Sequence, residues 1–428
     1  MKKIIIIGGG PAGLMAAVTS AEDGADVTLL EKMDRVGRKL RITGKGRCNL
    51  TNSAGRSDFL KKFSDGGRFI KPSFYRFSNT DLIEFFARNN VPVKTERGGR
   101  VFPESDSSED VVGALIGLAK KNGVKIITGA AVKKLIIKAA ATSDAGVASE
   151  SAEGAVTGVE LADGKIFEAD AVILSTGGAS YPSTGSTGDG YKIAALAGHG
   201  LTPIRGALVP VETSGGAAKK LQGLSLKNVS VSVFSDGKKK AEEFGEMLFT
   251  HFGLSGPVIL TLSALLSESL TSGAKTEVSI DLKPALDHKK LDARILRDLK
   301  MYGKQQLKTI LKNLLPKKMI PVCLSLTGIP PGKEGNGLTA DERKKLRVWL
   351  KDFRLGVFGC RGLDEAIITS GGIPVNEINP QDMSSKFVKN LFFAGEIIDM
   401  DAETGGYNLQ AAFSTGWVAG HAAAHSSG

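Results

Sequence analysis

The segment at residues 4–13, IIIIGGGPAG, constrains the fold more than any other part of the chain. Its isoleucines predict a buried parallel strand, and the glycines allow a tight turn into a helix whose first N–H groups face a pyrophosphate. Residues 14–30 then predict that helix and a second strand, which ends just before Glu31. An acid in this place accepts hydrogen bonds from a ribose diol, so the pattern predicts a dinucleotide site. Its turn comprises Gly8, Gly10, Pro11, Ala12 and Gly13.

Length and composition narrow the class of protein. A chain of 428 residues is longer than one hydrophobic core usually supports, so two or three domains are predicted. No apolar run reaches the roughly 18 residues of a membrane helix, and we expect no membrane partner. The first three residues lead straight into a strand with no signal-peptide core, which predicts a cytoplasmic protein. Three widely separated cysteines predict neither a disulfide framework nor a metal site.

The formal net charge of +11 raises the question of nucleic acid. The basic residues are spread along the chain without interleaved aromatics, and no helix-turn-helix or finger spacing is visible. We therefore expect no specific nucleic-acid partner. The lysines at 238–240 predict a solvated turn.

The pattern along the chain predicts one domain interrupted by another. An amphipathic helix at 106–121 and strands at 124–128, 131–137, 156–161 and 171–174 continue the α/β theme, and residues 139–155 predict an exposed hairpin tip. A strand-then-glycine pattern returns at 391–396, and a helix follows at 409–424. We predict an α/β fold in which residues 1–193 and 361–428 form a Rossmann-like domain. The inserted domain, 194–360, is predicted to be β-rich over 194–284 and about 321–360, and helical over 285–320.

Several motifs together resemble those of flavoproteins with two dinucleotide-binding domains, whose cofactor is FAD. Residues 37–52, GRKLRITGKGRCNLTN, are similar to the HI0933-like (BaiN-type) flavoprotein family, and residues 186–191, 248–257, 369–373 and 405–410 agree with it. With the glycine turn, the resemblance implies FAD contacts from Gly8, Gly10, Pro11, Ala12, Gly13, Glu31, Lys32, Arg38, Lys39, Gly46, Arg47, Cys48, Asn49, Ala131, Val132, Thr176, Gly177, Gly178, Gly395, Glu396, Asp399, Gly406, Tyr407, Asn408 and Gln410. Independently, a helix N-terminus after residues 405–406 suits the negative charge of a reduced flavin.

Catalytic candidates are few. His251 is the first candidate proton carrier, because imidazole titrates near neutrality, and a structural histidine in a domain-joining turn is the equal alternative. Arg47 offers a fixed positive charge or braces its own loop, and Tyr407 is a weaker candidate. Cys48 has no partner cysteine for disulfide chemistry, so we expect it to pack near the flavin. His421 and His425 lie one helical turn apart without a third ligand, which predicts a frayed helix end.

The resemblance implies an FAD-dependent oxidoreductase. One wing of the family is similar to 3-dehydro-bile-acid Δ4,6-reductases, so we expect reduction of an activated C=C bond in a small enone by hydride transfer through flavin N5. Residues 187–191, TGDGY, also resemble fumarate reductase and succinate dehydrogenase flavoproteins, which carry a capping domain in this position. An amine or aminoacetone oxidase and a non-catalytic flavin-binding protein are the alternatives. No second glycine fingerprint is present, so NAD(P)H is expected only as a transient donor, and the sequence leaves monomer or dimer open.

Overall fold

The computed structural model describes residues 1–63, 66–138 and 154–426, which form two compact units. Unit 1 comprises Met1–Gly206 and Ala366–Gly428, and unit 2 comprises Ala207–Glu365. Each unit has its own buried hydrophobic core. Unit 1 resumes after unit 2, and both boundaries lie later in the chain than 193 and 360. The predicted hairpin tip at 139–155 lies almost wholly outside the described residues.

Unit 1 is built on a parallel five-stranded sheet in the order β19-β10-β1-β2-β6. The pairing aligns Ile7 with both Leu30 and Leu174, and Leu174 with Phe393. The carboxyl ends of these strands therefore meet at one edge, which is where ligands bind in open α/β sheets. The strands are β1 (Lys3–Ile7), β2 (Asp26–Glu31), β6 (Lys125–Thr128), β10 (Ala171–Leu174) and β19 (Leu391–Phe393).

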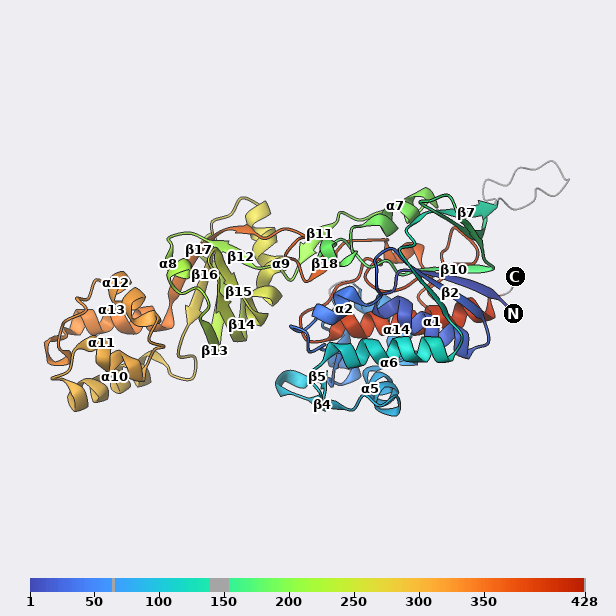
Figure 1. Ribbon diagram of the computed structural model, residues 1–428. Helices are drawn as coiled ribbons and strands as arrows, with labels where there is room; N and C mark the ends of the chain where they lie inside the picture. Colours follow the sequence, from blue (N-terminus) through green and yellow to red (C-terminus); the bar gives the residue numbers. More distant parts are fainter. Residues whose placement is uncertain (64–65, 139–153, 427–428) are drawn as a thin grey trace. The chain divides into compact units, whose positions relative to one another are not determined.

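Two helices from opposite ends of the chain lie side by side on this sheet. Figure 1 shows α1 (Pro11–Glu22, blue) beside α14 (Tyr407–His425, red), with α6 (Ser108–Lys121) next to α1. A Cβ at Gly416 would lie 2.3 Å from the Ala12 carbonyl oxygen, and one at Gly420 would lie 2.7 Å from that of Ala16. Glycine is thus required at both positions. Because residue 12 meets 416 and residue 16 meets 420, the two helices run parallel.

The rest of unit 1 surrounds the sheet with small elements. These include the antiparallel sheets β7-β8-β9 and β3-β5-β4. The elements are α2 (Arg38–Ile42), β3 (Thr51–Asn52), α3 (Arg56–Leu60), α4 (Gly67–Arg76), α5 (Asn79–Arg88), β4 (Val93–Thr95), β5 (Arg100–Pro103), β7 (Val132–Lys138), β8 (Ala155–Leu161), β9 (Ile166–Glu168), α7 (Asp189–Leu196), β11 (Arg205–Ala207) and β18 (Ile368–Ser370).

Unit 2 contains a closed barrel in the order β12-β15-β14-β13-β16-β17 and a group of helices. Its elements are β12 (Val211–Thr213), α8 (Ala217–Lys220), β13 (Ser225–Ser235), β14 (Lys238–Phe249), β15 (Gly253–Ser255), α9 (Pro257–Thr271), β16 (Thr276–Asp281), α10 (His288–Tyr302), α11 (Leu307–Ile310), α12 (Met319–Thr327), α13 (Ala340–Lys351) and β17 (Phe353–Cys360).

Two predictions for this unit are wrong. Residues 321–360 are not β-rich, because α12 and α13 cover 321–327 and 340–351, and among the named strands β17 alone lies in this range. The apolar run of α12 fits a buried strand as well as a buried helix, so its pattern does not decide between them. The lysines at 238–240 form the exposed start of β14 rather than a turn, although they are solvated as predicted.

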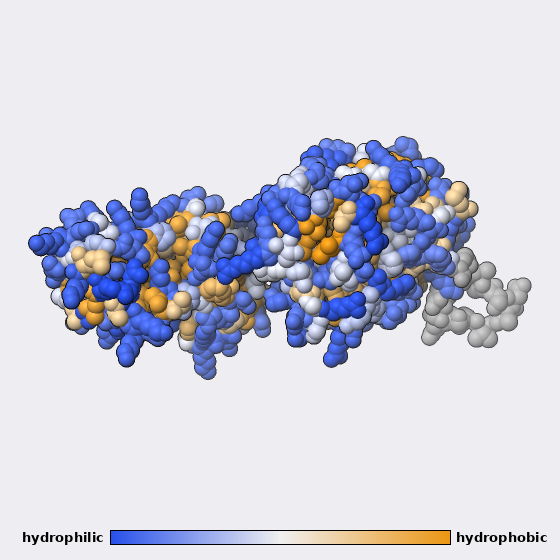
Figure 2. All heavy atoms as spheres, turned by 90° about the horizontal axis from the view of Figure 1, so that it is seen from below, coloured by the Kyte–Doolittle hydropathy of each residue, from blue (hydrophilic) through white to orange (hydrophobic). Residues whose placement is uncertain are grey.

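The viewed surface is mainly hydrophilic. Figure 2 shows hydrophilic residues over most of the viewed face of both units. Within the described residues, no helix is long and apolar enough to cross a membrane.

Candidate cofactor site

The glycine turn lies at the carboxyl edge of the sheet, where it opens a pocket within unit 1. Gly8 has φ +102°, and a Cβ there would lie 2.6 Å from the Ser175 carbonyl oxygen. A Cβ at Gly13 would lie 1.9 Å from the Gly8 carbonyl oxygen, whereas one at Gly10 would meet nothing within 4 Å. Gly8 and Gly13 therefore permit close backbone packing, and Gly10 leaves open space before the uncapped N-terminus of α1. Such a terminus suits an anion.

Glu31 ends β2 beside this turn. Its Oε2 accepts a hydrogen bond from the Gly9 N–H at 2.8 Å, and its Oε1 accepts one from the Met33 N–H at 2.8 Å. Each carboxylate oxygen can accept a second bond, and Glu31 lines the pocket. The side chain is therefore held in place by the backbone and retains capacity for two hydroxyl donors.

The N-terminus of α14 supplies another wall. Gly406 precedes the helix with φ +100°, and a Cβ there would lie 2.4 Å from the Thr51 carbonyl oxygen. Asn408 lines the pocket, and its Oδ1 and Nδ2 bond the backbone N–H and carbonyl of Ala402 at 2.9 and 2.8 Å. The pocket is thus flanked by the N-termini of both α1 and α14, each the positive end of a helix dipole.

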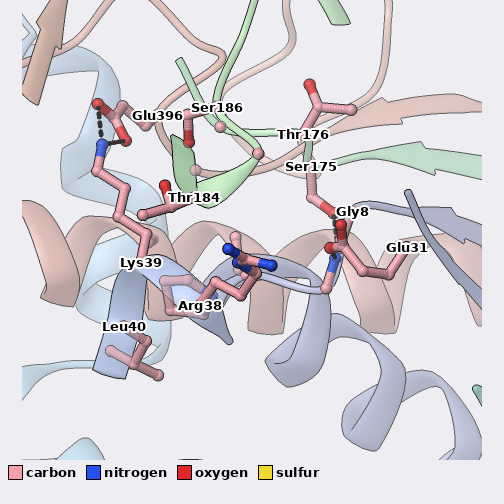
Figure 3. A pocket seen from close by; sticks show the side chains of 18 of the residues that line it. Gly8, Glu31, Arg38, Lys39, Leu40, Ser175, Thr176, Thr184, Ser186 and Glu396 are labelled. Atoms are coloured by element: carbon pink, nitrogen blue, oxygen red, sulfur yellow. Dashed lines mark hydrogen bonds and ion pairs between the residues drawn. The ribbon is translucent and has the colours of Figure 1, made fainter. Parts of the chain in front are cut away.

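A polar cluster joins four segments at one end of the pocket. Lys39 Nζ lies 2.8 Å from Glu396 Oε2 and donates to Ser180 Oγ at 2.7 Å. Glu396 Oε1 accepts from the Thr369 N–H at 2.8 Å, and Thr369 Oγ1 accepts from the Ala179 N–H at 2.8 Å. Figure 3 shows the Lys39–Glu396 pair well separated from Glu31, with Arg38 between them. The pocket is therefore elongated, as a dinucleotide requires.

Many of the predicted cofactor contacts line this pocket. They are Gly8, Gly10, Pro11, Ala12, Glu31, Lys32, Arg38, Lys39, Ala131, Val132, Thr176, Gly177, Gly395, Glu396 and Asn408. Those outside its lining are Gly13, Gly46, Arg47, Cys48, Asn49, Gly178, Asp399, Gly406, Tyr407 and Gln410. Gly13, Gly178 and Gly406 nevertheless shape it, because a Cβ at each would collide with a neighbouring backbone or side-chain atom.

Arg47 and Cys48 are engaged elsewhere in unit 1. The Arg47 guanidinium pairs with Glu96 and with Asp106, to which Nε donates at 2.9 Å, and it lies 4.2 Å from the centre of the Phe102 ring. The hydrogen bonds that Arg47 donates to Glu96 and Asp106 raise its pKa above the ordinary value. Two carboxylates therefore already balance its charge. Cys48 is fully buried, and burial raises the pKa of its thiol well above the ordinary value, so the thiol stays protonated.

The remaining catalytic candidates lie in different units. The Tyr407 ring is buried against Phe59, with ring centres 4.8 Å apart at 69°, and burial raises the pKa of its hydroxyl. His251 belongs to unit 2, where its exposed ring lies 4.9 Å from that of Phe252, just before β15. Of the three candidates, only Arg47 and Tyr407 therefore share a unit with the pocket.

Sequence reasoning missed several pocket residues. Ser186, Asp189 and Thr369 line the pocket and lie in motifs that carried the family resemblance, so a signal for them was present. Ser175 also lines it, and its Oγ donates to the carbonyls of Ile7 and Gly8 at 3.0 and 3.1 Å.

The residues of the pocket fit FAD. The backbone of the glycine turn leaves open space at Gly10, where a Cβ would meet nothing within 4 Å. Together with the Glu31 carboxylate and the two helix N-termini, this space suits the diol, the pyrophosphate and the flavin ring of one extended dinucleotide.

Comparisons with known proteins agree with this geometry. The chain is 32% identical over 426 residues to the 3-dehydro-bile acid delta(4,6)-reductase of Clostridium scindens, covering 99% of both chains. It is 30% identical to the ribosomal RNA dihydrouridine synthase of Haemophilus influenzae, covering 97% of this chain and 96% of that one. The 3-ketosteroid delta1-dehydrogenase of Sterolibacterium denitrificans has the same fold, with a TM-score of 0.54 at 12% identity over 99% of this chain and 100% of that one.

A family model, described as the HI0933-like protein Rossmann domain, matches residues 2–422. The resemblance drawn from the motifs is thereby confirmed, and the protein is an enzyme of the FAD-dependent oxidoreductase class. The chain belongs to the HI0933-like family.

Proposed function

We propose that the protein reduces a carbon–carbon double bond conjugated to a carbonyl group, in a small enone of the steroid type. The observation that carries the proposal is the elongated pocket, flanked by two helix N-termini, in a chain that matches a bile-acid enone reductase over 99% of its length. When bound, FAD supplies a hydride from N5 to the β-carbon of such a substrate. NAD(P)H is the proposed transient donor.

The residues of unit 1 hold the cofactor in this proposal. The N-terminus of α1 and the open space at Gly10 take the pyrophosphate, and Glu31 takes the adenosine ribose. The N-terminus of α14 stabilises negative charge at the pyrimidine end of the flavin, because its dipole supplies roughly half a positive charge. Lys39 and Glu396 fix the segments around this end through their mutual ion pair.

His251 is proposed to deliver the proton that the α-carbon of the substrate requires. Its ring is exposed, so it is accessible to a substrate and to water. His251→Ala should slow oxidation of the reduced flavin by an enone while leaving reduction of the flavin by NAD(P)H unchanged. His288→Ala, an exposed histidine of the same unit, is the matched control. Equal slowing of both half-reactions would contradict the role.

The reaction class is tested by anaerobic reoxidation. The purified protein should be yellow and release FAD rather than FMN on denaturation. After reduction, its flavin is mixed with 3-oxo-Δ4 steroids, enoates, fumarate or oxygen, and absorbance is followed by stopped flow. Rapid reoxidation by the steroid enone supports the proposal. Reoxidation by oxygen with peroxide release, coupled to turnover of an amine, would replace it with the oxidase alternative.

A second candidate is reduction of uridine in RNA. The ribosomal RNA dihydrouridine synthases of Haemophilus influenzae and Escherichia coli are 30% and 29% identical to the chain, each over 97% of it. The C5=C6 bond of uracil is also conjugated to a carbonyl, so the same flavin chemistry applies. Residues 288–318 of unit 2 hold ten lysines and arginines and two aspartates, which suits phosphate. A ribosomal RNA fragment in the same screen distinguishes the two substrates, because only the RNA reaction should weaken steeply with salt.

A further inference from the structure

We propose that Asp23, His421 and His425 bind a divalent transition-metal ion, for which Zn²⁺ is the best match. Among the described residues, these three form the group of metal-ligating side chains whose ligand atoms all lie within 4.8 Å of one another. The site is independent of the proposed flavin chemistry. It also supplies the third ligand that the histidine pair lacks in the sequence pattern.

The parallel pairing of α1 and α14 brings the three residues together. Asp23 directly follows α1, and His421 and His425 lie on one face of the last turns of α14, four residues apart. Gly420 packs against Ala16, and Ser20 Oγ donates to the Gly420 carbonyl at 3.0 Å. This close contact fixes the end of α14 beside the end of α1. The ligand atoms are therefore placed by the core of unit 1 rather than by a loose terminus.

The side chains already converge on one oxygen. Asp23 Oδ2 contacts His421 Nδ1 and lies 3.6 Å from His425 Nδ1. It is buried and accepts no hydrogen bond from the described residues. Buried carboxylate oxygens are normally bonded, and a cation held jointly with the two imidazoles would satisfy this one. Bonds of about 2.0–2.1 Å to zinc place tetrahedral ligands about 3.3 Å apart, so small side-chain rotations suffice.

The helix dipoles favour a cation at this place. Both α1 and α14 end here, and each C-terminus carries roughly half a negative charge in addition to the carboxylate. One hydrogen bond competes with metal binding, because His425 Nδ1 lies 2.9 Å from the His421 carbonyl oxygen. Coordination replaces that hydrogen bond by a metal bond. Lys2, one of the cations at this end of the sheet, contacts Ser426.

Three protein ligands leave one position for water in a tetrahedral site. The ion then ties the last turn of α14 to the corner between α1 and β2. The expected role is structural, because the two helices reach the cofactor pocket only with their opposite ends. Their length of roughly 18 Å or more separates this site from the pocket.

The test is metal binding by the full chain after chelation and removal of the chelator. Titration with ZnCl₂ by calorimetry should give one ion per chain and a raised melting temperature, and Co²⁺ should give visible absorption bands. His425→Ala removes a side chain that is 69% exposed, so the variant should fold and should bind Zn²⁺ about tenfold or more weakly. Asp23→Asn should also weaken Zn²⁺ binding, and His288→Ala should bind Zn²⁺ as tightly as the wild type.

Two results would overturn the proposal. One is the absence of saturable Zn²⁺ binding by the wild-type chain. The other is the same affinity and melting shift in His425→Ala as in the wild type. FAD content and Zn²⁺ binding are measured separately. A failed metal site would therefore leave the proposed reductase function standing, and a failed reductase test would leave the metal site standing.

Discussion

Replacing Glu31 by alanine should weaken the binding of FAD far more than that of FMN. Each oxygen of this carboxylate accepts one backbone N–H at 2.8 Å and retains one acceptor position toward the pocket. Two hydrogen bonds from a ribose diol to a charged acceptor contribute about 1.5 kcal/mol each at the lower end, or about 3 kcal/mol together. That loss corresponds to about a hundredfold in Kd.

FMN lacks the adenosine half, so its affinity for the same variant should stay near that of the wild type. Both flavins are titrated into apoprotein by quenching of flavin fluorescence at fixed ionic strength. Glu31→Gln keeps the size of the side chain and one acceptor oxygen. Its affinity for FAD should therefore lie between those of the wild type and Glu31→Ala. Equal loss for FMN and FAD would mean that the variant has loosened the Gly9 turn, and unchanged FAD affinity would remove Glu31 from the ribose site.

Other predictions test the frame of the pocket. Gly406→Ala should destabilise unit 1 by about 2 kcal/mol or more in urea unfolding, because its Cβ would lie 2.4 Å from the Thr51 carbonyl oxygen; Gly24→Ala, also at positive φ but with nothing within 4 Å, should cost less. Thr369→Val removes the acceptor of two backbone N–H groups and should reduce FAD retention, whereas Thr369→Ser should retain it. Burial lowers the pKa of His199 below 6.5, partly opposed by a neighbouring glutamate, so the unfolded chain binds more protons. Stability should therefore fall as pH drops below about 6.5, and less so in His199→Gln.

The parts of the fold that were predictable rest on short-range patterns. The strand, glycine turn, helix and acid lie within the first 31 residues, and each step follows from its neighbours. The position of Glu31 at the pocket follows from this local order. By contrast, Arg47 is balanced by Glu96 and Asp106, which are 49 and 59 residues away. No local pattern indicates such partners, so its charge looked available to a ligand.

In unit 2, the sequence pattern does not distinguish a buried helix from a buried strand. Residues 319–327, MIPVCLSLT, are apolar throughout, and a buried helix and a buried strand have the same composition at this length. A clearer helix signal lies farther along the chain, because Thr339 and Glu342 form a capping box at the start of α13. Serine or threonine followed three residues later by glutamate marks a helix start. That pair indicates a helix rather than strands at residues 340–351.

The split of unit 1 has a consequence for the order of events during translation. Residues 207–365 form a unit with its own core and are synthesised before β19 and α14. At that stage the parallel sheet ends at β10, whose open edge invites pairing with other chains, and the pocket has no second helix N-terminus. The nascent chain can therefore complete its insertion early but capture its cofactor only at the end of synthesis. A chain that ends at residue 365 and is free of the ribosome would be a colourless, aggregation-prone species with a folded barrel.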